Sequence, residues 1–199
     1  MANKTQLKIL SYLIDNKEKL LGIRELAKEI STAYYLVQRN IHQLKEKNII
    51  QLQKAGKTHI ITLSKEADSS YLIEAEAFKR ELFFKKYPEI KVILKKIIKQ
   101  AGSCFFVMLV FGSYTKNPRK DSDLDLLAIA PDEKYSKPIN NAISSVARTS
   151  PIEIHETILT EESFLSLSRK KELNVASESL NNHIIIYGSE NFYKLQDEA

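Results

Sequence analysis

Residues 111–130 read FGSYTKNPRKDSDLDLLAIA, and the pair Asp123 and Asp125 stands inside an otherwise apolar segment. Two carboxylates at this spacing are costly to bury unless something compensates their charge. In an extended strand, both aspartates face the same side while Leu124 and Leu126 enter the core. The segment therefore predicts either a solvated strand end or a site that holds metal ions.

A third carboxylate, Glu153, stands in residues 151–159, which are also predicted to form a strand. There Glu153, His155 and Thr157 share one face of the strand, and Ile152, Ile154 and Ile158 lie on the other. Oxygen ligands suit Mg²⁺, and three carboxylates on neighbouring strands suit a two-metal phosphoryl-transfer site. Two interpretations of His155 stay open: a structural histidine, or one that contacts a molecule bound at the site.

The apolar stretch that ends at Phe111 is followed at once by the turn Gly112-Ser113. Glycine lets the backbone approach a phosphate closely, and the Ser113 hydroxyl is available at the start of a short helix. Basic side chains between this turn and the aspartates are placed to meet β- and γ-phosphates or the leaving pyrophosphate; they are Lys116, Arg119 and Lys120. The turn therefore predicts binding of a nucleoside triphosphate.

The combined pattern resembles the signature of the DNA polymerase beta-type nucleotidyltransferases, in which hydrophobic-Gly-Ser is followed after a spacer by Asp-hydrophobic-Asp. The minimal members are the most similar, over about residues 103–195. The resemblance implies Mg²⁺-dependent transfer of a nucleoside monophosphate, expected to be AMP from ATP, to a hydroxyl, with two metal ions. It implies nucleotide-binding roles for Gly112 and Ser113, and catalytic and metal-binding roles for Asp123, Asp125 and Glu153.

The chain departs from that family at two places. The third carboxylate is often Asp in the superfamily, whereas Glu153 is one methylene longer. Lys116 and Asn117 stand where Arg-Gly is common. These departures affect the prediction of catalytic turnover more than the prediction of the fold. The alternative is a retained fold whose site is inactive or only binds a ligand.

The superfamily also suggests acceptors, namely a protein hydroxyl such as a toxin tyrosine, or an RNA 3′ end. Minimal members often occur as antitoxins to HEPN-type ribonucleases, but nothing in this chain shows such a partner, and a toxin partner stays open. A second hypothesis is a DNA-binding transcriptional regulator whose nucleotidyltransferase fold senses a nucleotide or holds a partner without catalysis. Modification of a small molecule ranks last, because no extra acceptor-binding domain is visible.

Residues 1–64 are predicted to form a winged helix-turn-helix domain. Apolar residues at helical spacing indicate three helices, and two short strands follow; the segments are 4–18, 22–30, 33–48 and 49–64. This order resembles winged-helix DNA-binding domains over the full segment. Ser31-Thr32 is expected to cap the third helix, whose core-facing residues would be Leu36, Ile41 and Leu44.

The basic residues are concentrated in this first domain. Residues 1–64 carry 11 Lys/Arg and 5 Asp/Glu, whereas the remaining 135 residues carry 19 and 20. Such a bias favours contact with a polyanion, here double-stranded DNA. The residues expected at the groove and the phosphates are Tyr34, Tyr35, Gln38, Arg39, Lys54 and Lys57. Dimerisation or protein contact is the alternative, and a homodimer stays open.

The expected fold class is an α/β (α+β) nucleotidyltransferase domain with a small mixed sheet over residues 101–199, preceded by a helical connector over 65–100. Thr160 is expected to cap a long helix over 160–180. The longest apolar run, Cys104–Phe111, is too short to cross a bilayer, and the N-terminus has no signal-peptide layout. The expectation is therefore a cytoplasmic protein with no membrane partner.

Overall fold

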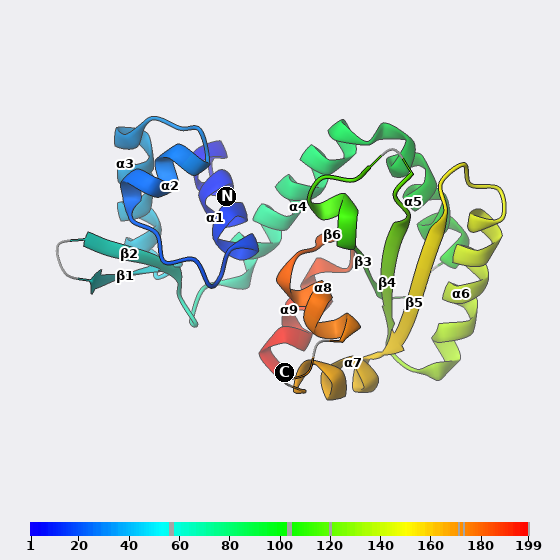
Figure 1. The fold of residues 1–199 in the computed structure, drawn as a ribbon. Helices are drawn as coiled ribbons and strands as arrows, with labels where there is room; N and C mark the ends of the chain where they lie inside the picture. Colours follow the sequence, from blue (N-terminus) through cyan, green and yellow to red (C-terminus); the bar gives the residue numbers. More distant parts are fainter. Residues whose placement is uncertain (56–57, 103–104, 120, 171, 173, 199) are drawn as a thin grey trace. The chain divides into compact units, whose positions relative to one another are not determined.

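The computed structural model describes residues 1–55, 58–102, 105–119, 121–170, 172 and 174–198 (Figure 1). The chain divides into two compact units, Met1–Lys79 and Arg80–Ala199. The division falls within helix α4 (Ser69–Lys86), so each unit receives part of the expected connector. Among the described helices, none is both long enough and apolar enough to span a membrane.

The first unit begins with three helices followed by an antiparallel hairpin. Its elements are α1 (Lys4–Asp15), α2 (Ile23–Glu29), α3 (Tyr34–Glu46), β1 (Ile50–Ala55) and β2 (Thr58–Leu63). The two strands pair from Ile50 opposite Leu63 to Ala55 opposite Thr58. This order of elements confirms the predicted winged helix-turn-helix arrangement.

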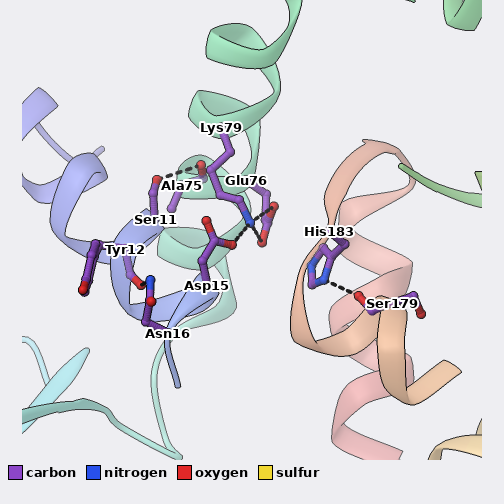
Figure 2. Close-up of polar contacts among 9 residues, drawn as sticks. All are labelled: Ser11, Tyr12, Asp15, Asn16, Ala75, Glu76, Lys79, Ser179 and His183. Carbon is purple, nitrogen blue, oxygen red and sulfur yellow. Dashed lines mark hydrogen bonds and ion pairs between the residues drawn. The ribbon is translucent and has the colours of Figure 1, made fainter. Parts of the chain in front are cut away.

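Polar contacts fix α1 against its neighbours in the first unit. The Asn3 side chain caps α1 in a capping box with Gln6, and its Nδ2 donates to Asn40 Oδ1 of α3 at 2.8 Å. Figure 2 shows the contacts with α4, where Lys79 Nζ lies 2.6 Å from Asp15 Oδ1 and 3.2 Å from Glu76 Oε2. The first half of α4 is therefore part of this unit, and its Ala75 belongs to the same apolar core.

The start of α3 differs from the prediction in two ways. Ser31 and Thr32 do not cap α3, whose N-cap is Ala33 without a side-chain hydrogen bond. Both residues end α2 instead, since Ser31 has a positive φ of 47° and the Thr32 N–H donates to Ala27 O. The expectation for Leu36 was also wrong, because Leu36 is only half-buried and Val37 occupies the core with Ile41 and Leu44.

The second unit is built around a mixed sheet, as predicted. Pro88 stands at the start of α5, and the later elements alternate between strands and helices. They are α5 (Pro88–Ala101), β3 (Val107–Phe111), the 3₁₀ helix η1 (Gly112–Thr115), β4 (Leu124–Ala130), α6 (Glu133–Ala147), β5 (Ile154–Thr160), α7 (Glu161–Ser168), α8 (Val175–Asn181), β6 (Ile184–Tyr187) and α9 (Ser189–Glu198).

The strand order is β5-β4-β3-β6, with β4 and β5 parallel and the other two pairings antiparallel (Figure 1). Leu124, Leu126 and Ala128 pack into one apolar core with residues of α5 and α6. The alternate residues of β4 therefore face the opposite side. Helices α7, α8 and α9 contact the strands there. Asp125 belongs to that second face.

The helix expected over 160–180 is two helices. Thr160 caps the first of them, α7, as predicted, accepting a hydrogen bond from the Ser163 N–H. Asn174 then starts α8 through a capping box with Ser177. In the same unit, the buried His183 Nδ1 lies 2.7 Å from Ser179 O at the end of α8 (Figure 2). Because the segment is divided between α7 and α8, α8 is a separate helix, and it contacts β3.

Candidate functional site

The turn after β3 holds Gly112 directly against Asp125. Gly112 has a positive φ of 68°, a conformation in which a Cβ is strained. A Cβ here would overlap Asp125 Oδ2 and lie 3.0 Å from its Cγ. The Ser113 backbone N–H donates to the same carboxylate. The Gly-Ser turn therefore has a structural role besides the expected phosphate contact, because it positions the Asp125 carboxylate.

Parallel pairing of β4 and β5 aligns the candidate carboxylates. The Leu124 N–H donates to Glu153 O at 2.8 Å, and Asp125 lies opposite His155 in the register. Asp123, one residue before β4, is thereby brought beside Glu153, one residue before β5. Asp123 and Asp125 are both partly buried, whereas Glu153 is exposed.

His155 stands between the acidic groups. Its Nε2 is 3.2 Å from Glu153 Oε1, and its Nδ1 is 3.9 Å from Asp123 Oδ2. One ligand atom each from Asp123, Glu153 and His155 lie within 4.8 Å of one another. Asp125 is not a member of this group. With its side chain 57% exposed, His155 is not the partly buried structural histidine of the first interpretation.

Two pKa shifts describe the electrostatics of this site. Burial raises the pKa of Asp125 above its usual 3.8, and the negative charges of Asp123 and Glu178 raise it further. The hydrogen bond to Glu153 raises the pKa of His155, with smaller contributions from Asp123 and Asp125. The carboxylates therefore crowd negative charge that a nearby cation would relieve.

Glu178, in α8, is a site residue that sequence reasoning missed. Its charge reaches Asp125 although 53 positions separate the two in the numbering. The predicted continuous helix over 160–180 gave no reason to bring it near β4. The signal that would have found it is Asn174 followed three residues later by Ser177, a capping pattern that starts a new helix.

The basic residues expected to meet phosphates lie between η1 and β4. Lys116 directly follows η1 and is exposed, and Arg119 is exposed in the next turn. That turn is closed by the Arg119 N–H, which donates to Ser122 Oγ at 2.8 Å. Lys120 lies outside the described residues. Lys116 and Arg119 thus occupy the loop that joins the glycine turn to Asp123.

Helix α3 presents the side chains expected to contact DNA. Tyr35 is 68% exposed and Tyr34 is 42% exposed. Arg39 is exposed and Gln38 is half-buried on the same helix. The Arg24 guanidinium of α2 lies 5.7 Å from the centre of the Tyr34 ring. On the hairpin, Lys54 of β1 is exposed, whereas Lys57 lies outside the described residues.

No family model and no curated protein matches this chain. Three solved structures are similar to part of it. ZitR from Lactococcus lactis has 19% identity and a TM-score of 0.37, and the match covers 45% of this chain and 60% of the ZitR chain. HlyU from Vibrio cholerae has 23% identity and a TM-score of 0.32, and the match covers 44% of this chain and 80% of the HlyU chain.

The third structure is MepR, a transcription regulator of the Staphylococcus aureus multidrug efflux pump MepA. It has 16% identity and a TM-score of 0.34, covering 49% of this chain and 78% of its own. At such identities and TM-scores, the likeness says nothing about what this chain binds.

Proposed function

We propose that the second unit is a nucleotidyltransferase that moves a nucleoside monophosphate, AMP from ATP, onto a macromolecular hydroxyl. The observation that carries the proposal is the position of Asp123 and Asp125 at the start of β4. Asp125 lies against the Gly112-Ser113 turn, and Asp123 lies beside Glu153 of the neighbouring strand segment. The resemblance to minimal polymerase beta-type enzymes supports the same reading.

The side chains present fit a divalent cation. Asp123, Asp125 and Glu153 offer carboxylate oxygens, the ligands that Mg²⁺ prefers. Burial raises the pKa of Asp125, so His155 and the Ser113 N–H compensate the charge of its ionised form only in part in the metal-free protein. A cation beside Asp125 would supply that compensation, as it does in many acidic sites. When bound, Mg²⁺ ions would neutralise phosphate charge and lower the pKa of an attacking hydroxyl.

In this proposal each group of the chain has a defined task. Asp123 and Asp125 hold the cations, and Ser113, Lys116, Arg119 and Lys120 bind the β- and γ-phosphates. The acceptor oxygen forms a bond to the α-phosphorus, and the bond from that phosphorus to pyrophosphate breaks. Glu153 would help to hold the cation beside the acceptor, and its carboxylate accepts the proton of the acceptor hydroxyl, which balances the reaction.

The position of the radioactive label in ATP tests the reaction type. The 199-residue protein is incubated with Mg²⁺, unfractionated RNA and ATP labelled at either the α- or the γ-phosphate. Nucleotidyl transfer places α-label, and no γ-label, in acid-precipitable RNA or protein and releases pyrophosphate. Precipitated γ-label would instead indicate a kinase. If the protein binds ATP but transfers neither label, the result would favour the alternative of a DNA-binding regulator that senses a nucleotide.

A second function concerns the winged unit, which we propose binds double-stranded DNA through α3. The specific support is the set of exposed side chains on one helix, with Tyr35 and Arg39 one helical turn apart. The excess of basic residues in 1–64 supplies the attraction to phosphates. DNA binding is compatible with catalysis. In the alternative hypothesis of a transcriptional regulator, DNA binding is the main function, and the second unit only senses a nucleotide or holds a partner.

Arg39→Ala is expected to weaken DNA binding by roughly tenfold, because a groove or phosphate contact is lost. Fluorescence anisotropy of short random-sequence duplexes with the 199-residue protein measures this effect, at several salt concentrations. Arg148→Ala is the matched control, since it removes the same charge from an exposed position in the second unit. Equal weakening by both substitutions, or affinity independent of salt, would contradict DNA binding through α3.

A further inference from the structure

His155 is an exposed histidine of the candidate site, on β5. Its side chain is 57% exposed, and the polar atoms near its ring are carboxylate oxygens. Both ring nitrogens face acidic groups, with Glu153 at 3.2 Å and Asp123 at 3.9 Å. Strand pairing fixes this position, since β5 aligns His155 with Asp125 of β4. An imidazole held between two carboxylates at a strand end is a ligand arrangement suited to a metal ion.

The spacing of the three groups is compatible with a single ion. Ligand atoms about 2.0–2.2 Å from one metal lie roughly 3–4 Å from each other. One atom each from Asp123, Glu153 and His155 already fall within 4.8 Å. Glu153 is 72% exposed, so a change of rotamer closes the remaining gap without repacking any core residue.

The donor set points to a particular class of metal. Mg²⁺ takes oxygen ligands and holds its waters strongly, so an imidazole nitrogen is a poor ligand for it. First-row transition ions bind imidazole more readily, and Mn²⁺ also accepts carboxylates, phosphates and water. We infer that His155 is a metal ligand and that Asp123, Glu153 and His155 form a site which prefers Mn²⁺-type ions to Mg²⁺.

This inference rests on the proposed function, because that function supplies the reason for a cation beside Asp123. It goes beyond that function by adding a nitrogen ligand from β5 and by naming the class of metal used. Asp125, which is not a member of the group, remains available beside Gly112. Loss of His155 is therefore expected to change metal choice while leaving the Asp123-Asp125 pair in place.

Electron paramagnetic resonance of Mn²⁺ tests the inference directly on the 199-residue protein without nucleotide. Titration of Mn²⁺ gives the bound fraction, and competition with Mg²⁺ gives the preference. His155→Ala is expected to weaken Mn²⁺ binding by roughly tenfold or more. It is also expected to abolish the ¹⁴N coupling that an imidazole ligand gives to bound Mn²⁺. His42→Ala, at an exposed histidine of the first unit, is the control.

Unchanged Mn²⁺ affinity in His155→Ala, or a wild-type spectrum without ¹⁴N coupling, would overturn the inference. Calorimetry with Mg²⁺ and ATP separates this failure from failure of the proposed function. If Mg²⁺-dependent ATP binding persists while the ¹⁴N coupling is absent, only the metal inference fails. If ¹⁴N coupling is present while no nucleotide binds, the metal site stands and the transferase proposal fails.

Discussion

Asp125→Asn is expected to abolish Mg²⁺-dependent ATP binding and to raise the thermal stability of the metal-free protein. The loss of binding follows because an amide cannot replace an anionic metal ligand. The gain in stability follows because the folded state holds the Asp125 carboxylate half-buried beside Asp123 and Glu178. Function and stability are thus expected to change in opposite directions at this one residue.

The size of the stability change depends on pH. The pKa of Asp125 is raised in the folded state, so ionised Asp125 disfavours folding. Below the unfolded-state value of 3.8, Asp125 is protonated in both states, and wild type and variant should be equally stable. As the pH rises through the folded-state pKa, Asp125 ionises and the free energy of unfolding of the wild type falls. The variant has no carboxylate at this position, so its stability does not fall in this way.

Thermal unfolding in EDTA at a series of pH values measures the effect. At neutral pH we expect the melting temperature of Asp125→Asn to exceed that of wild type by on the order of 2 °C. The difference should shrink as the pH falls toward 3.8. Asp121→Asn, at an exposed carboxylate before β4, should leave the melting temperature unchanged. A less stable Asp125→Asn at neutral pH would contradict the argument.

Gly188→Ala is expected to destabilise the second unit severely. Gly188 has a positive φ of 78° between β6 and α9. A Cβ there would overlap the Phe106 backbone oxygen and lie 3.1 Å from Val107 Cα. Because both obstacles are backbone atoms next to β3, neither can move without shifting the strand. We expect a loss of about 3–5 kcal/mol in the free energy of unfolding.

Gly102→Ala separates the cost of conformation from the cost of collision. Gly102 has a similar φ of 75°, and a Cβ there would meet no atom within 4 Å. Its replacement should therefore cost only the conformational term, about 1–2 kcal/mol. Urea denaturation followed by circular dichroism measures both variants. Equal losses would show that the contact with Phe106 does not limit substitution at Gly188.

Much of the fold could be predicted from apolar spacing. The three helices and hairpin of the first unit, Pro88 at the start of α5 and the mixed sheet all follow from local patterns. The errors arose where residues serve a neighbour rather than the expected element. Ser31 and Thr32 end α2 through backbone hydrogen bonds, although their type suits an N-cap of α3. Asn174 divides a segment whose composition is helical throughout.

The candidate site was predictable only in part. Strand alternation correctly places Asp125 on the face away from Leu124 and Leu126. Alternation does not give the register between strands, and it is the register that aligns His155 with Asp125. The contact of Gly112 with the Asp125 carboxylate and the approach of Glu178 both depend on packing between distant segments. Such contacts have no signature within a single segment.

Isothermal titration of ATP into the 199-residue protein, with Mg²⁺ or with EDTA, tests the central claim most directly. The account predicts binding that requires Mg²⁺ and is lost in the Asp123→Asn/Asp125→Asn double variant, whose circular dichroism spectrum stays unchanged. GTP, CTP and UTP, titrated in the same way, identify the preferred base. Absence of binding by all four nucleotides, or binding that survives both EDTA and the double substitution, would contradict a metal-dependent nucleotide site at Asp123 and Asp125.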